Sequence, residues 1–197
     1  MRGTRVDAVQ DDRGDAGRGD QLSRRAALGA GVAAVAAIAT TAAPGSALAS
    51  AVDTRSADRS NAAIWADWIA LWNGDLSRAA HIIAPDITLH MTPIGGGPLA
   101  PLESPAGMAR WIGGLHQAIV PFTFVVQVAP LFQRDMIAGR WRATGRYAGG
   151  LPGAKARPGT PIAFAGADFL RIKDGKIAEY WLSADVLDLM GQLRMLG

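Results

Sequence analysis

The chain has 197 residues, enough for one domain core but, once a leader is removed, too few for two domains of ordinary size. It contains no cysteine, which excludes a disulfide framework, a thiolate metal site and a cysteine nucleophile. Its net charge of +3 is small, and its basic residues do not concentrate as they do in nucleic-acid-binding proteins, so we expect no nucleic-acid partner.

The N-terminus, residues 1–49, has the organisation of a secretion signal. A stretch rich in Asp, Gly and Arg precedes the pair Arg24-Arg25, and an uncharged run dominated by Ala follows from Ala26 to Val52. Charged, apolar and small residues follow one another in this order in signal peptides. The segment resembles a twin-arginine signal peptide with cleavage after Ala49, followed by a flexible start of the mature chain at residues 50–59.

This interpretation predicts a protein that is exported to the periplasm, the cell wall or the extracellular space. It would meet the membrane only transiently, during export. The alternative is a transmembrane anchor, since about twenty apolar residues can span a bilayer. Ala and Gly insert more weakly than Leu, however, and Pro44 interrupts the run, so we favour the cleaved signal.

Three helices are expected at the start of the remaining domain, residues 60–197. Apolar residues of the first helix recur at i, i+3, i+4 and i+7 before Asn73-Gly74 ends the pattern. Asp75 can cap a second, short helix that Pro85 stops, and Ser104-Pro105 begins the third. The apolar positions of the first helix are Trp65, Trp68, Ile69 and Trp72.

The second half of the domain changes to the period of two that is typical of strands. One strand at 87–91 precedes the third helix, four follow it, and Asp174-Gly175 forms a hairpin turn between the last two. Helices early and strands late indicate an α+β fold. We expect a cone-shaped, curved antiparallel sheet packed against three N-terminal helices, an α+β barrel with room for a small molecule. The four later strands are expected at 122–128, 136–147, 161–172 and 177–183, before a short terminal helix.

Several segments of the domain resemble the SnoaL-like polyketide cyclases, a branch of the nuclear transport factor two-like superfamily. The resemblance implies the cone fold, a small apolar or polycyclic ligand, no cofactor and a homodimer formed through the outer face of the sheet. It does not settle activity, because members of this superfamily include both enzymes and binding proteins. The segments are 72–76, 168–172, 174–177 and 179–181, together with Asp185 and Gln192-Leu193.

The resemblance assigns catalysis to Asp185, which stands where the cyclases have an Asp that acts as general acid and base in an aldol ring closure. Such a group must take a proton from carbon and return one to the new alkoxide. The alternative is that Asp185 caps the terminal helix. His90, on the first strand, could donate a hydrogen bond to a carbonyl or enolate, or it could be an edge-strand His with a local partner.

Arg140 and Asp168 are candidate substrate-binding residues. In the related cyclases an Arg on an inner strand is common, and Arg140 could bind a carboxylate or stabilise an oxyanion. Asp168, on the adjacent strand, could pair with Arg140. The alternatives are that Arg140 lies on a solvated outer face and that the two residues form only a surface salt bridge.

Aromatic residues could line the ligand site. Trp65, Trp68 and Trp72 belong first of all to the core, but together with Phe124 and Trp181 they could also wall an aromatic ligand. The three His are scattered without a metal-binding spacing, so no metal site is expected.

Two functions remain open on this sequence. One is a cofactor-independent acid/base enzyme of the cyclase, isomerase or dehydratase type, acting on an apolar carbonyl compound. The other is a non-catalytic module that binds a ligand or dimerises outside the cytoplasm. A buried Asp185 facing His90 or Arg140 across a pocket would favour the enzyme, whereas an exposed Asp185 beside a filled cone would favour the module.

Overall fold

The computed structural model describes residues 60–93 and 97–196. The expected signal peptide (1–49) and the start of the mature chain (50–59) lie outside these residues. Across the described part of the chain, no helix combines the length and hydropathy needed to cross a membrane. In chain order the elements are a helix through residues 60–72, η1 (Leu76–Arg78), α2 (Ala79–Ile82), β1 (Ile83–His90), α3 (Pro105–Ala118), β2 (Thr123–Gln133), β3 (Met136–Arg146), β4 (Pro161–Lys173), β5 (Lys176–Ala184) and α4 (Val186–Gln192).

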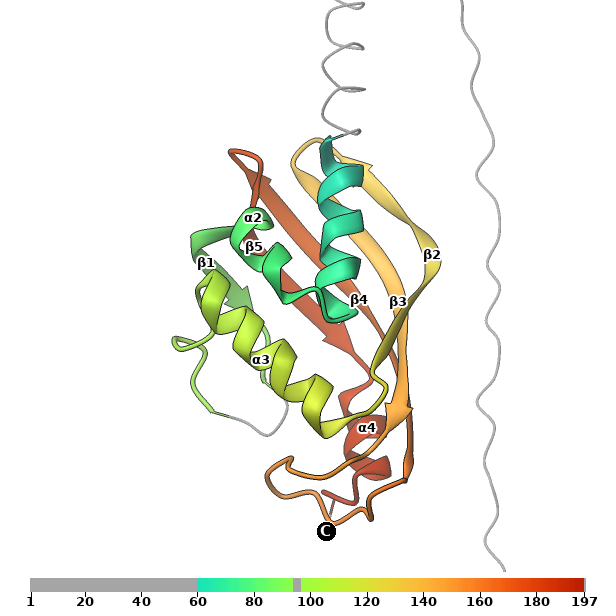
Figure 1. The fold of residues 1–197 in the computed structure, drawn as a ribbon. Coiled ribbons are helices and arrows are strands. Elements are labelled where there is room, and N and C mark those ends of the chain that lie inside the picture. The colour runs from blue at the N-terminus through green and yellow to red at the C-terminus, as the bar shows by residue number, and fades with distance from the viewer. Residues whose placement is uncertain (1–59, 94–96, 197) are drawn as a thin grey trace, which may run out of the picture. The chain divides into compact units, whose positions relative to one another are not determined.

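The five strands form one sheet in the order β1-β5-β4-β3-β2 (Figure 1). Adjacent strands from β2 to β5 pair antiparallel. Asp174 and Gly175, both with positive φ angles, form the hairpin turn between β4 and β5. The α+β class and the order of strands and helices are thus confirmed. The sheet is open. One detail differs from the prediction of an antiparallel sheet, because β1 pairs with β5 in parallel. β1 and β5 can pair in parallel because a long connection through α3, β2, β3 and β4 joins them, rather than a hairpin.

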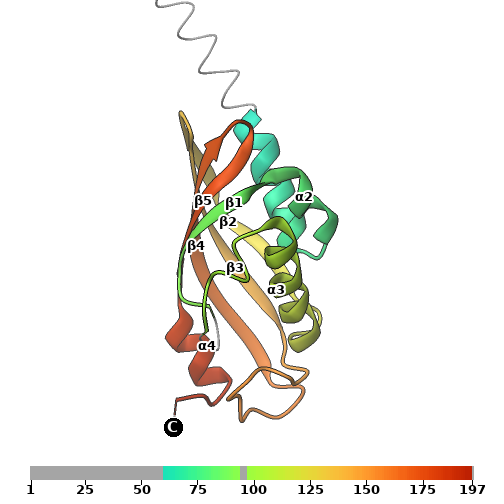
Figure 2. The same cartoon turned by 90° about the vertical axis from the view of Figure 1, so that its left-hand side faces the viewer.

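The helix of residues 60–72, α2 and α3 cover one face of the sheet, and none of these three helices lies on the opposite face (Figure 2). The second helix is shorter than predicted, since η1 and α2 end at Ile82 and Ile83 already pairs with Ile177 in the sheet. Pro85 therefore lies inside an edge strand, where its missing N–H costs little. α4 and the loop that follows β3 lie together at the end of the sheet nearest the C-terminus (Figure 1).

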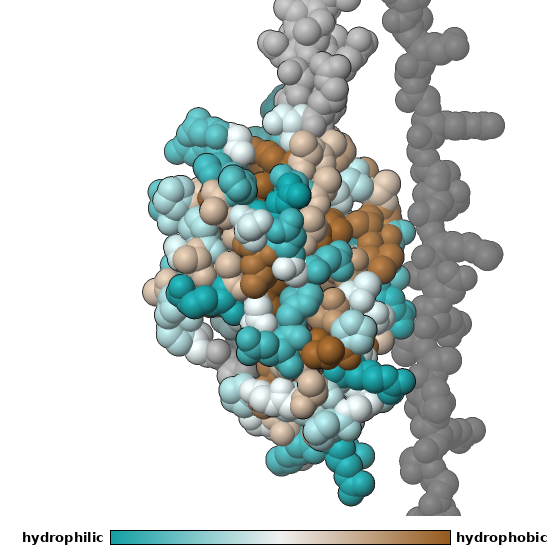
Figure 3. Space-filling view, in the orientation of Figure 1, coloured by the Kyte–Doolittle hydropathy of each residue, from teal (hydrophilic) through white to brown (hydrophobic). Residues whose placement is uncertain are grey.

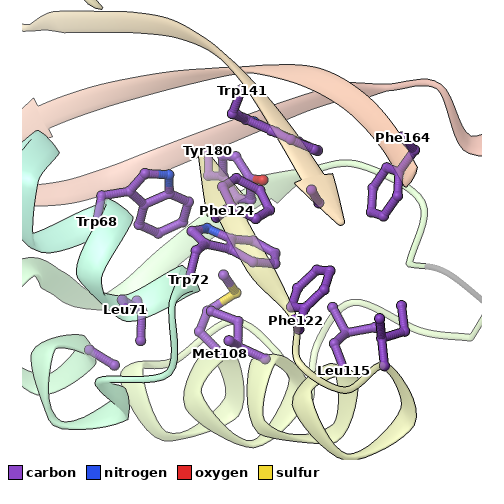
Figure 4. Close-up of a cluster of buried hydrophobic side chains, with 14 of the residues drawn as sticks. Trp68, Leu71, Trp72, Met108, Leu115, Phe122, Phe124, Trp141, Phe164 and Tyr180 are labelled. Carbon is purple, nitrogen blue, oxygen red and sulfur yellow. The ribbon is translucent and has the colours of Figure 1, made fainter. Parts of the chain in front are cut away.

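The core lies between the helices and the covered face of the sheet, and aromatic side chains dominate it (Figure 4). Trp72 stacks on Phe124 with ring centroids 5.0 Å apart, and Phe124 packs against Trp141 at 4.2 Å. Asn73 fastens the end of the first helix to β2, because its side-chain amide accepts from Phe124 N (2.9 Å) and donates to Phe124 O (3.0 Å). The prediction that the Trp stripe belongs to the core is confirmed.

α4 is attached to β4 by a similar side-chain bridge. Gln192 accepts a hydrogen bond from Ala163 N (2.8 Å) and donates one to Ala163 O (2.7 Å). Ala163 lies beyond the last residue pair of β4 with β5, so the amide of Gln192 satisfies backbone groups that the sheet leaves free. Leu189 and Leu193 are fully buried on the same helix turn, and together these contacts place α4 at the end of the sheet.

Candidate functional site

A cleft of about 740 Å³ opens where β5 ends and α4 begins. One wall comes from the residues just after β1, another from the end of β5 and the start of α4, and a third from the loop after β3. The volume suits a small organic molecule, since ligand sites usually enclose a few hundred to a thousand Å³. The lining residues are Met91, Thr92, Pro93, Pro152, Gly153, Leu182, Ser183, Ala184, Val186, Met190 and Met195.

No side chain of this lining is charged or titratable near neutral pH. Among the described residues of the lining, only Thr92 and Ser183 carry side-chain hydroxyl groups, and the other side chains are apolar. Three methionines, Met91, Met190 and Met195, supply flexible thioether side chains that can adapt to ligands of different shapes. The cleft is therefore suited to an uncharged, mostly apolar molecule.

The interior of the cone, by contrast, is filled. Leu182, Ala184 and Val186 separate the cleft from an enclosed cavity of only about 10 Å³, whose other walls are core residues. A cavity of that size holds a single water molecule at most. The deep space expected between sheet and helices is thus occupied by aromatic side chains, among them Trp72, Phe122, Phe124, Trp141 and Phe164 (Figure 4).

Asp185 lies at the rim of the cleft and is exposed to solvent. Its chain neighbours Ala184 and Val186 line the cleft, whereas its own side chain does not. It occupies the N-cap position of α4, but its carboxylate makes no capping hydrogen bond. Neither His90 nor Arg140 faces it across a pocket, because neither residue lines the cleft.

His90 lies on the uncovered face of the sheet, in a network of side chains that contact one another. Its ring stacks on Trp181 at 4.4 Å, and its Nε2 is 3.0 Å from Glu179 Oε2. Arg171 pairs with the other oxygen of Glu179 at 2.8 Å and with Asp135 at 2.8 Å. His90 thus has a local partner, and its ring and that of Trp181 both lie on the face opposite the aromatic core.

A shallow hollow of about 470 Å³ lies beside this network. No Asp or Glu lines this hollow. Asp185 lies instead at the rim of the cleft between β5 and α4. Its lining combines His90, Met136, Phe169, Arg171, Trp181, Leu182 and Ser183.

Arg140 and Asp168 do not meet, so the predicted pairing is wrong. On β3, Arg140 points to the uncovered face and is exposed, whereas on β4 Asp168 points into the core and is fully buried. The register explains the separation, because Asp168 lies opposite Gly139 and Arg140 lies opposite Ala167. Adjacent positions along a strand point to opposite faces.

Asp168 is the buried polar centre of the domain. Trp68 Nε1 donates a 2.9 Å hydrogen bond to one carboxyl oxygen, and the hydroxyl of Tyr180 donates one of 2.9 Å to the other. Burial raises the pKa of Asp168 from 3.8 to about 6, and these donors oppose the rise. Trp141 also lies close enough to lower this pKa, although its buried N–H does not reach hydrogen-bond geometry. Burial, followed by the carboxylate, raises the pKa of Tyr180 well above its usual value.

The remaining aromatic candidates serve the core. Trp65 and Trp68 are buried, and Trp65 packs so closely against Gly139 that no larger residue fits there. Phe124 lines the small enclosed cavity and not the cleft. Within residues 60–93 and 97–196, no three side chains of the His, Asp and Glu types gather in a metal-binding cluster.

The methionines of the cleft are functional candidates that the sequence pattern does not indicate. Met91 is the last residue of the strand predicted at 87–91, and Met190 lies in the short helix predicted at the end of the chain. No local signal brings them together, because Met91 and Met190 are separated by four strands and a helix. Their meeting depends on the parallel pairing of β1 with β5, which the sequence pattern did not reveal.

The comparisons with known proteins agree with this geometry. The family model described as a SnoaL-like domain matches residues 65–180, which include every strand except the last residues of β5. No curated protein matches the chain.

Three solved structures from Streptomyces share the fold. TsrD from Streptomyces laurentii is 20% identical over 70% of this chain and 97% of its own, with a TM-score of 0.57. AclR from Streptomyces galilaeus, a candidate hydroxylase, is 23% identical over 71% and 83%, with a TM-score of 0.57. IdmH from Streptomyces antibioticus, a candidate polyketide cyclase, is 25% identical over 68% and 97%, with a TM-score of 0.56.

Proposed function

Because this chain belongs to the SnoaL-like domain family, we propose that it binds a small, uncharged, apolar molecule in the cleft between β5 and α4. One observation carries the proposal: a cleft of about 740 Å³ whose side chains are apolar apart from two hydroxyl groups. IdmH, a candidate polyketide cyclase of similar fold, supports a carbonyl-bearing or polycyclic ligand as the first class to test.

The absence of charge in the cleft lining determines which ligands are favourable. An ion that enters an apolar cleft loses its hydration and finds no opposite charge, at a cost of several kcal/mol. An uncharged apolar ligand instead gains about 25 cal/mol for each Å² that it buries. Polar groups of the ligand are limited to those that Thr92, Ser183 or nearby backbone groups can hydrogen-bond.

The test is ligand capture by the mature domain. The purified protein is incubated with an extract of its own source, washed and analysed by native mass spectrometry for small molecules that remain bound. Met190→Lys places a cation in the cleft and should abolish capture, whereas Asp188→Lys, an exposed change on the same helix, should leave it intact. Equal capture by both variants would rule out the cleft as the binding site.

A second candidate function is acid/base catalysis at the rim. It is favoured by the position of Asp185 between two residues that line the cleft. There the carboxylate could exchange protons with a carbonyl compound held by the apolar lining, without a cofactor. Solvent exposure weighs against it, because a desolvated carboxyl with a raised pKa is the better general acid and base at neutral pH. We therefore place non-catalytic binding first.

We further propose that the domain forms a homodimer through the uncovered face of the sheet. One row of side chains on this face crosses all five strands, and Phe169 (43% exposed) and Leu131 (72% exposed) belong to it. Exposed apolar side chains that lie next to one another are a candidate interface. The outer row consists of His90, Trp181, Phe169, Ala138 and Leu131.

Charge on either side of the outer row favours a second copy as the partner. Arg140 and Arg142 lie on one side of the row. On the other side, the two carboxylates of Asp135 and Glu179 share one cation, Arg171, which leaves a net negative charge among these three groups. A two-fold axis along the row would bring the basic side of each copy against the acidic side of its partner. Figure 3, which views the helix-covered side, shows further apolar surface along β2 at the edge of the sheet.

Sedimentation analysis tests the dimer. Phe169→Asp should convert the domain to a monomer, because it places a charge in the middle of the outer row. Leu187→Asp is the control, since Leu187 is also an exposed apolar residue (72%) but lies on α4. A wild-type monomer at every concentration, or a Phe169→Asp dimer, would contradict the proposal.

Finally, we propose that the chain is exported by the twin-arginine route, on the strength of Arg24-Arg25 and the apolar run after them. Replacing both arginines by Lys in the full chain should leave the protein in the cytoplasm. Replacing Arg13 and Arg18 by Lys is the control and should permit export. Exported protein that begins at Ser50 would support cleavage after Ala49, and full-length protein in the membrane fraction would instead support the anchor.

A further inference from the structure

Methionines concentrate in the cleft. The chain has six, and of the five beyond Met1, three line this one cavity: Met91, Met190 and Met195. All three are half-buried, so solvent reaches part of each side chain. Because the chain has no cysteine, methionine thioethers are its only sulfur groups open to oxidation.

The other two methionines lie in different environments. Met108 is 0% exposed inside α3 and is closed to any dissolved oxidant. Met136 is half-buried on the uncovered face of the sheet, beside the outer row. The same chain therefore offers a protected methionine and an accessible one outside the cleft as internal references.

We propose that Met91, Met190 and Met195 are a site of oxidative modification, and that their conversion to sulfoxides closes the cleft to apolar ligands. The closing effect rests on the proposed function of the cleft. It requires an oxidant of the peroxide class, which an exported protein would meet without the reducing systems of the cytoplasm.

The chemistry is an oxygen-atom transfer. A thioether sulfur attacks the peroxide, the O–O bond breaks, one oxygen atom becomes the sulfoxide oxygen, and the other leaves as water. Sulfur loses two electrons and the peroxide gains them. Each product is a polar, chiral group in place of an apolar one.

The consequence for binding follows from the composition of the cleft. Two hydroxyl groups, on Thr92 and Ser183, are the only side-chain donors that could satisfy three new sulfoxide oxygens. An apolar ligand would therefore cover polar oxygens that lack partners, or would be kept out by the water that solvates them. We expect affinity for an apolar ligand to fall by about tenfold or more.

The experiment combines peptide mapping with binding of the neutral dye N-phenyl-1-naphthylamine. The mature protein is treated with hydrogen peroxide, and each methionine peptide is followed by its gain of one oxygen atom. Sulfoxide should form at the three cleft methionines while Met108 stays unmodified, and dye affinity should fall in parallel. Methionine sulfoxide reductases A and B with dithiothreitol should restore binding, since the reductant has no disulfide to attack in this chain.

The variant Met136→Leu distinguishes the effect of oxidation in the cleft from that of oxidation on the uncovered face, because it removes the accessible methionine outside the cleft. Peroxide should weaken dye binding by this variant as strongly as by the wild type. Oxidation of Met108 as fast as of the cleft methionines, or unchanged dye binding with three sulfoxides in place, would overturn the proposal. If the untreated protein does not bind the dye, the proposed function fails, and the closing effect fails with it. The peptide masses still decide whether the cleft is the preferred site of oxidation.

Discussion

The indole N–H of Trp68 donates a 2.9 Å hydrogen bond to the carboxyl group of Asp168, 100 residues later in the chain. Tyr180 donates to the other oxygen of the same carboxyl group, so the helix of residues 60–72, β4 and β5 meet at one buried acid. None of the described cavities is lined by Asp168. We therefore interpret this acid as the anchor that holds the first helix to the sheet.

Replacing Trp68, which donates to Asp168, should lower the free energy of unfolding more than replacing Trp65, a similarly buried Trp of the same helix. Trp68→Phe leaves one oxygen of a buried acid without its partner, and we expect a loss of about 2 to 3 kcal/mol in the free energy of unfolding. Trp65→Phe is the control, because Trp65 is similarly buried but has no hydrogen bond to Asp168. Urea denaturation at pH 7 measures both, and equal losses would show that only packing matters.

Asp168 should also make stability depend on pH. Its pKa is about 6 in the folded domain and near 3.8 in the unfolded chain, so the folded state binds this proton more tightly. Stability from this group is therefore greatest when it is protonated and falls as the pH rises from about 4 to 6. The pKa difference corresponds to a fall on the order of 3 kcal/mol, with no further change at higher pH.

Asp168→Asn isolates this effect, because Asn carries no charge at any pH. The difference in unfolding free energy between wild type and variant should favour the wild type most near pH 4 and shrink toward pH 7. Urea denaturation at several pH values measures the difference. A difference that stays constant with pH, or grows as the pH rises, would show that the buried carboxyl does not titrate as the structure indicates.

The fold was predictable because its signals are local. The apolar spacing of the first helix, Ser104 accepting from Gly107 N at the start of α3, and the positive φ of Asp174 and Gly175 in the last hairpin each follow from a few adjacent residues. The parallel place of β1 beside β5 was not predictable, since it depends on contacts between segments about 90 residues apart.

The candidate site was less predictable, because strand alternation divides the side chains between two faces of the sheet but does not show which face the helices cover. Arg140 and Asp168 occupy neighbouring positions on adjacent strands, and a difference of one residue in register sends them to opposite faces. His90 and Trp181 went to the uncovered face for the same reason. The cleft itself lies where three distant segments meet, and only the fold brings them together.

Two glycines should respond in opposite directions to substitution by Ala. A methyl group at Gly139 would collide with the Trp65 ring, so Gly139→Ala should destabilise the domain by about 1 to 3 kcal/mol. Gly114 lies exposed within α3 with no atom near the position of a Cβ, so Gly114→Ala should stabilise it by about 0.5 to 1 kcal/mol. Thermal unfolding measures both, and a stable Gly139→Ala variant would mean that Trp65 has another position available.

Asp185→Asn separates binding from catalysis in the cleft. The carboxylate is exposed, makes no capping hydrogen bond and lies outside the cleft lining. If the domain only binds its ligand, the variant should match the wild type within about twofold in affinity and within about 0.5 kcal/mol in stability. The measurement is titration with the captured ligand, followed by mass analysis of that ligand after prolonged incubation with each protein. Conversion of the ligand by the wild type but not by Asp185→Asn would reverse our order of the two candidate functions, because a rim carboxylate would then carry the proton transfer.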